Sequence, residues 1–382
     1  MKKYFLTILF IGFWGCDDND DTESEVVDNT NPEVSITSPN FEGEGFNAVF
    51  DVVTIASAVY DNIGIDRVEF LVDESIICTD TEEPYECEWD TDGYEVNSEY
   101  IISVKAYDIS GNLGQNTITV IVDDYVELWG ESYSIVNTDA IYVQNDSTIV
   151  SIPEEIASLI NLEILDLSGN SLFGEIPPVV GDLINLKELR LNNNQLNGEI
   201  PYLIGDLINL KVLELNNNQL NGEIPAVIGN LINLEVLSLA FNQITGEIIP
   251  EIGFLVNLDG LNLSENSLEG EIPVEIGSLI NLTHLQFSGN NLTGTLPSAI
   301  GNLINLYYFN VNDNNLSGEL PIELGNLTAL EGFMIAFNNF SGVIPEEICG
   351  IPGYIEIGLN AFCDPIPDCI QNVGPQDTSD CP

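Results

Sequence analysis

Residues 165–177 read LDLSGNSLFGEIP, residues 189–201 read LRLNNNQLNGEIP, and residues 213–225 read LELNNNQLNGEIP. One phrase of 13 residues therefore returns every 24 residues, and it continues with small changes to about residue 345. Self-similarity at a fixed period of this length is typical of a solenoid, in which each repeat stacks on its neighbours. This stretch decides the fold of the chain.

Two columns of the repeat are apolar in every copy. The first holds Leu165, Leu189, Leu213, Leu237, Leu261, Leu285, Phe309 and Phe333, and the second lies two residues later, from Leu167 to Ile335. Apolar residues at this spacing are typical of a strand with one buried face. We therefore predict one short strand in each copy and a parallel sheet formed by the stacked strands.

Two polar or small columns mark the turns. Asparagine recurs every 24 residues from Asn170 to Asn338, and glycine does so from Gly174 to Gly342. An amide side chain both donates and accepts, so it can satisfy backbone groups that a turn would leave unpaired. Glycine permits a tight bend or a positive φ. We therefore predict an asparagine ladder along the solenoid.

These columns together resemble the plant-type leucine-rich repeat, LxxLxxLxLxxNxLxGxIPxxIGxLxN, of plant receptor ectodomains and polygalacturonase-inhibiting proteins. The resemblance implies a curved solenoid with the LxLxxN strands on its concave side, a second short strand near LxGxIP and a helical turn near IGxL. One copy departs from the pattern, because Pro250 stands one place late and Ile249 takes the usual proline position. We expect a different local backbone there.

The open ends of a stacked sheet need caps. On the N-side, Trp129 and Tyr133 precede a degenerate copy in which Ile141 falls 24 residues before Leu165. On the C-side, residues 357–360 begin a truncated copy that runs into a cysteine cluster. We place the solenoid at residues 125–382, with an N-side cap at 125–140 and a Cys-rich cap at 346–382.

Residues 32–124 hold short alternating runs, namely VSITS, VVTIASAVY, RVEFLVD, YIISVKAYD and NTITVIVDD. Turn signals such as DNIG, DTDG and DISGN separate them, which favours an antiparallel β-sandwich. The phrases AVYDNIGIDRVEFLVD, PYECEWDT and KAYDISGN resemble bacterial immunoglobulin-like domains of secreted and surface proteins. Asp61 and Asp108 lie in the DxxG turns, where we expect turn capping rather than metal binding. The chain is thus mainly β, an immunoglobulin-like sandwich followed by a leucine-rich-repeat solenoid.

The N-terminus has the features of an export signal. Lys2 and Lys3 precede an apolar run at 4–14 that is too short to span a membrane. Cys16 after Gly15 resembles a bacterial lipoprotein lipobox, in which Cys16 would be lipidated after removal of residues 1–15. Cleavage by the ordinary signal peptidase is the alternative, since Trp14 is bulky for that pattern.

The acidic segment 16–31 lacks the apolar residues needed to fold, and we expect a disordered tether. An acidic stretch behind the lipid cysteine resembles the surface-export signal of Bacteroidetes lipoproteins. We therefore expect export, and attachment to the bacterial outer membrane or cell surface through the N-terminal lipid alone.

Apart from Cys16, the six cysteines form an even set, which favours disulfides in an oxidising compartment: Cys78, Cys87, Cys349, Cys363, Cys369 and Cys381. Cys78 and Cys87 flank a turn containing Pro84, which suits a local bond across neighbouring strands. The other four allow three connectivities. Resemblance to the CGxPLxxC cap of plant repeats favours Cys363 with Cys369, leaving Cys349 for Cys381. A zinc site is the alternative, but the sequence has no histidine nearby.

Net charge and sequence motifs argue against several classes of function. With 62 acidic and 7 basic residues, the net charge of −55 argues against nucleic acid and anionic lipid headgroups. The sequence contains no DxDxDG calcium loop, and its one histidine, His284, has no partner motif. The glutamates of the GEIP phrase are a repeat feature on a solvated edge. We expect no enzyme, no cofactor and no metal.

Binding is the remaining class of function. Three positions of each copy should face the concave side, and they change from copy to copy: the residue before the first leucine, the residue between the two leucines and the residue just before the ladder asparagine. Exposed aromatic residues often mark contacts, so the candidate ligand-binding residues are Phe241, His284, Tyr308, Met334 and Phe337. The alternative is that some of these rings only cover neighbouring strands.

The leading hypothesis is a cell-surface recognition protein that binds a protein or polysaccharide on the concave face, with tether and sandwich as a spacer. A structural adhesion or envelope protein that self-associates is the alternative. Ice binding is a third, resting on a two-copy polar array of Asn192, Asn193, Asn216 and Asn217.

Overall fold

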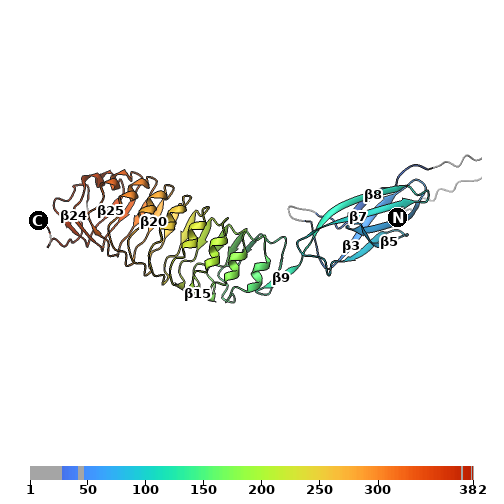
Figure 1. Cartoon of the computed structure of the whole chain (residues 1–382), viewed down its shortest axis with the longest axis horizontal. Coiled ribbons are helices and arrows are strands. Elements are labelled where there is room, and N and C mark those ends of the chain that lie inside the picture. The colour runs from blue at the N-terminus through green and yellow to red at the C-terminus, as the bar shows by residue number, and fades with distance from the viewer. Residues whose placement is uncertain (1–27, 42–46, 371–372, 380, 382) are drawn as a thin grey trace, which may run out of the picture. The chain divides into compact units, whose positions relative to one another are not determined.

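The computed structural model of the chain describes residues 28–41, 47–370, 373–379 and 381. The predicted signal peptide, Cys16 and nearly all of the predicted tether lie outside these residues. Two compact units form, a β-sandwich and a solenoid, and each is described by itself (Figure 1). Among the described residues, no helix is long and apolar enough to cross a membrane.

The sandwich has two sheets, with strand orders β1-β3-β6 and β2-β8-β7-β4-β5. Its strands are β1 (Glu33–Ser38), β2 (Ala48–Val49), β3 (Val52–Tyr60), β4 (Ile65–Val72), β5 (Ser75–Asp80), β6 (Tyr85–Asp90), β7 (Glu99–Asp108) and β8 (Leu113–Val122). Alternate residues point inward, so Ile55, Phe70 and Trp89 are buried between the sheets. The predicted antiparallel sandwich is confirmed, with one exception, since β2 pairs with β8 in parallel.

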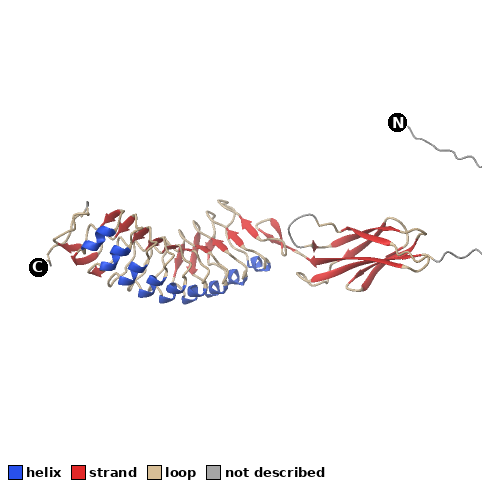
Figure 2. Ribbon diagram, turned by 90° about the horizontal axis from the view of Figure 1, so that it is seen from above, coloured by secondary structure: helices blue, strands red, loops and turns tan. Residues whose placement is uncertain are grey.

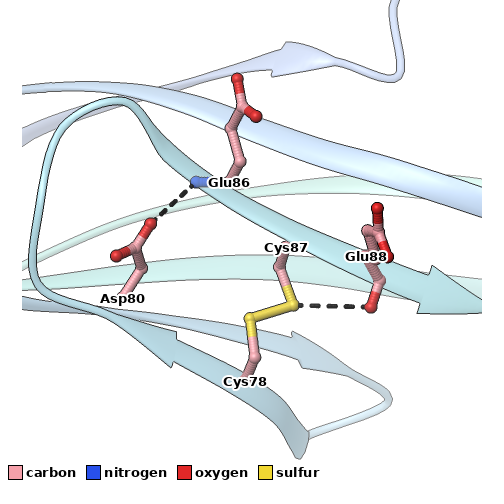
Figure 3. Close-up of a disulfide and its surroundings, with 5 residues drawn as sticks. All are labelled: Cys78, Asp80, Glu86, Cys87 and Glu88. Carbon is pink, nitrogen blue, oxygen red and sulfur yellow. Dashed lines mark hydrogen bonds between the residues drawn. A yellow bond between two sulfur atoms is a disulfide. The ribbon is translucent and has the colours of Figure 1, made fainter.

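Cys78 and Cys87 form a disulfide, as expected, but it joins the two sheets (Figure 3). Cys78 lies on β5, whose neighbour is β4, and Cys87 lies on β6, whose neighbour is β3. The two strands follow each other in the sequence, and the chain crosses from one sheet to the other in the turn between them. The backbone N–H of Glu86 donates to Asp80 Oδ2 at 3.1 Å across this turn (Figure 3).

In the solenoid, ten parallel strands stack in sequence order, as predicted. They are β11 (Ala140–Tyr142), β12 (Ile164–Asp166), β14 (Glu188–Arg190), β16 (Val212–Glu214), β18 (Val236–Ser238), β19 (Gly260–Asn262), β20 (His284–Gln286), β21 (Tyr308–Asn310), β23 (Gly332–Met334) and β25 (Tyr354–Glu356). Equivalent leucines face each other, for example Leu165 and Leu189, so the leucine columns fill one continuous core. The predicted degenerate first copy is confirmed, because Ile141 pairs with Leu165.

A short 3-10 helix follows each IP phrase, and Figure 2 shows these helices along one side of the solenoid. They are η1 (Glu154–Ser158), η2 (Pro178–Asp182), η3 (Tyr202–Asp206), η4 (Ala226–Asn230), η5 (Pro250–Phe254), η6 (Val274–Ser278), η7 (Ser298–Asn302), η8 (Ile322–Asn326) and η9 (Glu346–Gly350). The predicted second strands near LxGxIP are β13 (Phe173–Gly174), β15 (Gln195–Glu199), β17 (Gln219–Asn221), β22 (Ser317–Gly318), β24 (Asn339–Val343) and β26 (Ala361–Cys363).

The departure at Pro250 does not change the backbone, so that expectation was wrong. Ile249 precedes η5 with φ −67° and ψ 139°, whereas Pro273 precedes η6 with φ −66° and ψ 141°. Any residue can adopt these extended angles. Pro250 then occupies the first helical position, where its missing N–H costs nothing.

The asparagine ladder is confirmed at atomic detail. The side chain of Asn218 accepts from the backbone N–H of Leu196 at 3.0 Å and donates to the carbonyls of Leu191 and Leu215, both at 3.0 Å. The tail continues the ladder, because Gln376 accepts from Phe362 N–H and donates to the Ile357 carbonyl. A glutamine thus takes the place of the next asparagine.

A second asparagine ladder was not predicted. Each asparagine of the LINL or LVNL phrase donates to the carbonyl oxygen 25 residues earlier, in the preceding copy. The seven bonds, from that of Asn161 to Val136 through that of Asn305 to Ile280, measure 2.8 to 2.9 Å. These bonds fix the turn between each helix and the next strand.

The C-side cap corrects the favoured disulfide pairing. Gly181, Gly205 and the glycines that follow every 24 residues lie where the next helical turn approaches closely, and a Cβ on Gly205 would be 2.5 Å from the Cβ of Val227. Cys349 occupies the last position of this glycine column. Its side chain therefore meets the following turn, where it is bonded to Cys369. Cys363 is bonded to Cys381, not to Cys369.

On the N-side, a hairpin of β9 (Tyr125–Leu128) and β10 (Glu131–Ser134) precedes the first copy. Leu128 is fully buried in the solenoid core, and Trp129 Nε1 donates to the Ser151 carbonyl at 2.8 Å. Tyr133 packs against the same core. The residues expected to cap the sheet therefore do so.

Candidate ligand-binding surface

The exposed side of the ten-stranded sheet, here called the sheet face, carries ion pairs in its first half. Arg190 on β14 donates to Glu188 on the same strand and lies 3.3 Å from Glu214 on β16. Two more pairs join neighbouring copies, Lys187 with Glu163 at 2.6 Å and Lys211 with Glu235 at 2.9 Å. Each Lys and Arg of the solenoid sequence is therefore already paired.

Arg190 stays charged in this setting. Partial burial disfavours the charged guanidinium, but the hydrogen bond to Glu188 and the charges of Glu188 and Glu214 outweigh it, so the pKa of Arg190 is raised. The pKa of Lys211 is also raised, because its ammonium donates to Glu235. These exposed pairs set the charge pattern more than they stabilise the fold.

The second half of the sheet face carries an aromatic cluster, which we define as His284, Tyr307, Tyr308 and Met334. The rings of His284 and Tyr308 stack with centroids 6.3 Å apart, and the Tyr308 hydroxyl lies 3.1 Å from Met334 Sδ. The Tyr307 ring lies 6.0 Å from His284. The structure thus brings together three of the five predicted candidates, which come from β20, β21 and β23.

Two residues of this region were missed from the sequence. Tyr307 is 52 % exposed and stands one place before the first column that we read, so it was not counted. Gly332 is buried under Tyr308, since a Cβ there would lie 2.8 Å from the tyrosine Cδ2. The glycine lets the Tyr308 ring lie flat over the neighbouring strand. A glycine beside an aromatic residue in adjacent copies was the available signal.

Phe241 and Phe337, the other two candidates, lie four copies apart and do not form one patch with each other. Both rings are half exposed, at 54 % and 50 %, and both residues have positive φ, 54° and 56°. Asn217 and Gly289 fill the same column in other copies with similar angles. A bulky residue there costs on the order of 1 kcal/mol, so the fold alone does not explain these phenylalanines.

A hydrogen-bonded chain orients His284. Thr283 Oγ1 lies 2.8 Å from His284 Nδ1 and donates to Asp259 Oδ1 at 2.8 Å. His284 and Asp259 are exposed, and Thr283 is half-buried. The arrangement positions the imidazole beside Tyr308, and we assign it a role in ring placement.

In the sandwich, Asp61 and Asp108 make the capping bonds expected of them. Asp61 Oδ2 accepts from the backbone N–H groups of Ile63 and Gly64, and Asp108 Oδ1 accepts from that of Asn112. Asp28 joins them, so that one carboxylate oxygen of each lies within 4.8 Å of the others. The hydrogen bond from Thr30 N–H is the main reason that the pKa of Asp28 is lowered.

The asparagine array considered for ice binding does not continue along the sheet face. Asn192 and Asn193 are followed by Asn216 and Asn217, but the next copy has Ala240 and Phe241. The array remains two copies long.

Comparison with known families agrees with this architecture. The family described as "Bacterial Ig domain" matches residues 32–120. The family "Leucine-rich repeat region" matches residues 142–249, and the family "Leucine Rich Repeat" matches residues 257–279, 281–303 and 305–327. None of the curated protein sequences is similar enough to this chain to count as a relative.

Solved structures with a similar fold include plant receptors. A TDR receptor is 32 % identical with a TM-score of 0.56, over 58 % of this chain and 39 % of that one. The Arabidopsis receptor kinase HAESA, solved with a peptide hormone and a co-receptor, is 31 % identical with a TM-score of 0.56, over 61 % of this chain and 40 % of that one. A plant ice-binding protein is 27 % identical with a TM-score of 0.50, over 64 % of this chain and 78 % of that one.

The present chain spans less than half of the length of these two receptor chains. What it shares with them is the fold of the repeat region. The families that match and the two units of the structure lead to the same description. The chain carries a bacterial Ig domain followed by leucine-rich repeats of the kind found in plant receptor ectodomains.

Proposed function

We propose that this protein is an exported, non-enzymatic recognition protein whose solenoid binds a protein or polysaccharide through the sheet face. The observation that carries the proposal is the aromatic cluster, where exposed rings are held on a rigid sheet by contacts with each other. Aromatic anchors of this kind dominate many binding interfaces. The strained, exposed Phe337 adds a further ring in the copy that contains Met334.

Charge restricts the chemistry of the ligand. From residue 212 to the end, the sequence has no Lys or Arg, so the half of the sheet face with the aromatic cluster offers no lysine or arginine side chain. An anionic ligand would meet repulsion from the surrounding carboxylates. The ligand is therefore a neutral glycan or a neutral or basic peptide segment.

The similar receptor HAESA was solved with a peptide hormone, which supports a peptide as one of the two ligand classes. The three disulfides support a location outside the reducing cytoplasm. A lipid on Cys16 would hold the protein at the bacterial surface. This anchoring rests on the sequence resemblance alone.

A binding screen tests the proposal. The purified chain is presented to a panel of neutral glycans, acidic glycans and extended peptides of differing charge, and binding is measured by calorimetry. We expect saturable binding of a neutral glycan or of a neutral or basic peptide. Preference for acidic members of the panel, or no saturable binding to any member, would contradict the proposal.

A further inference from the structure

An exposed aliphatic row runs along the solenoid at the turn between each 3-10 helix and the next strand of the ten-stranded sheet. We call this row the apolar ladder and define it as Ile184, Ile208, Ile232, Val256, Ile280 and Ile304. Its side chains are 46 to 58 % exposed. The leucines on either side of each ladder residue are buried, for example Leu183 and Leu186.

The fold does not require these residues. Exposed turns favour Gly, Asn, Asp, Ser and Pro, and the next copy has Thr328 at the same place. Six half-exposed aliphatic side chains in one row present roughly 500 Å² of apolar surface, as much as the largest patch of a typical monomer, which is often functional. The row therefore points to a partner.

The ladder is rigid before it binds. From the second ladder residue on, the asparagine that follows donates to the carbonyl of the ladder residue in the preceding copy, as Asn209 does to Ile184 at 2.9 Å. β-Branched side chains have few rotamers to lose. Binding through this row therefore has a low ordering cost.

Two columns flank the ladder, and their charges are complementary. The positions two residues before each ladder residue hold Asp182, Asp206, Asn230, Phe254, Ser278 and Asn302. The positions three residues after each ladder residue hold Lys187, Lys211, Glu235, Asp259, Thr283 and Tyr307. Eleven of these twelve residues are exposed, and Thr283 is half-buried. Acidic residues thus lie on one side of the first two copies and basic residues on the other.

We propose that the apolar ladder is the interface between two copies of this chain, arranged in parallel around a two-fold axis that runs along the ladder. Such an axis places each ladder residue against its own counterpart and each flanking column against the other column of the partner copy. Asp182 and Asp206 then face Lys187 and Lys211 of the partner copy, which would share their charge between these aspartates and Glu163 and Glu235 of their own copy.

The opposite, antiparallel arrangement is less favourable. It would set each flanking column against itself in reverse order, so that Glu235 of one copy faces Asp259 of the other. Like charges in contact disfavour that pairing. In the parallel arrangement Glu235 faces Asn230, Asp259 faces Phe254, and no two like charges meet. With both flanks included, each copy buries on the order of the 800 Å² of a standard interface.

The parallel dimer needs no ligand, so it can fail or hold separately from the proposed function, although Tyr307 belongs both to the aromatic cluster and to a flanking column. Its first test is sedimentation of the purified chain over a range of concentrations. We expect a dimer with a dissociation constant on the order of 10 μM or tighter. Ile232→Asp, which sets two carboxylates against each other on the axis, should weaken it at least tenfold.

Val274→Asp is the matched control, because Val274 is 61 % exposed on η6 but lies outside the ladder. It should leave the dimer unchanged, and circular dichroism should show both variants folded. The proposal is overturned if the wild-type chain stays monomeric at about ten times the expected dissociation constant. It is also overturned if Ile232→Asp weakens the dimer no more than Val274→Asp does.

Cysteine cross-linking tests the direction. In a Cys16→Ser background, Ile184→Cys and Ile304→Cys, at opposite ends of the ladder, should each cross-link to itself under mild oxidation. When the two variants are mixed and oxidised, no cross-link should form between an Ile184→Cys chain and an Ile304→Cys chain. Cross-linking only between the two different variants would show an antiparallel dimer and overturn the parallel arrangement.

Discussion

Single asparagines hold much of this solenoid together. A ladder residue such as Asn218 satisfies one N–H and two carbonyls from two successive copies, and its leucine neighbours are buried. Asn209, in the second ladder, makes one bond to the Ile184 carbonyl at an exposed turn. The same residue type therefore has two different energetic roles.

Asn218→Ala should lower the free energy of unfolding by about 2 to 4 kcal/mol, because three backbone groups lose their partner and water cannot replace it. Asn209→Ala should cost less than about 1 kcal/mol, since water can bond the exposed carbonyl. Chemical denaturation of both variants checks the contrast. An equal loss of unfolding free energy in the two variants would contradict a larger contribution from the buried ladder.

The residues of the first ladder could be predicted because the 24-residue period aligns them, and a turn needs its backbone groups paired. The candidate site could be predicted in part. His284, Tyr308 and Met334 stand at neighbouring strand positions, so stacking of copies brings them together. Tyr307 was missed because it precedes the strand, and the sequence does not show that its ring turns back toward His284.

At the scale of elements, strand positions followed from the period, whereas the disulfides of the C-side cap did not. Resemblance to the CGxPLxxC cap of plant repeats favoured Cys363 with Cys369. The actual pairing depends on Cys349 replacing a glycine that touches the next turn, which only the packing of successive helices shows. The backbone at Pro250 was also predicted wrongly, because Ile249 can adopt the φ and ψ angles that proline has at this position in other copies.

Peptide mapping of the unreduced protein should recover Cys349 linked to Cys369 and Cys363 linked to Cys381. Removal of the first bond by Cys349→Ser with Cys369→Ser should cost about 2 to 4 kcal/mol, because the unfolded chain is less constrained. The thermal unfolding of the double variant checks this magnitude. A peptide that links Cys363 to Cys369 would contradict the cap described here.

At the scale of the whole molecule, charge and export act together. The chain has a net charge of −55, and the three basic residues of the solenoid are paired with glutamates. An acidic surface of this kind stays soluble and repels anionic membranes. This surface therefore disfavours direct contact between the solenoid and anionic headgroups.

Cys16→Ala should release the protein from the membrane fraction or leave it with its signal peptide, because Cys16 is the proposed site of lipidation. Cell fractionation with mass spectrometry of the mature N-terminus measures both outcomes. Trp14→Ala is the control, since it brings the sequence closer to the lipobox pattern and should keep the anchor. An unmodified mature N-terminus downstream of Cys16 would contradict lipidation.

The most direct test of recognition by the sheet face is the affinity of two single variants for the strongest binder found in the screen. Tyr308→Ala should weaken binding at least fivefold, since truncation of an aromatic anchor typically costs more than about 1 kcal/mol. Glu199→Ala, on the exposed edge of β15, should change it less than about twofold. Loss of affinity in Glu199→Ala with Tyr308→Ala unchanged, both variants being folded, would place recognition on the edge and contradict the account.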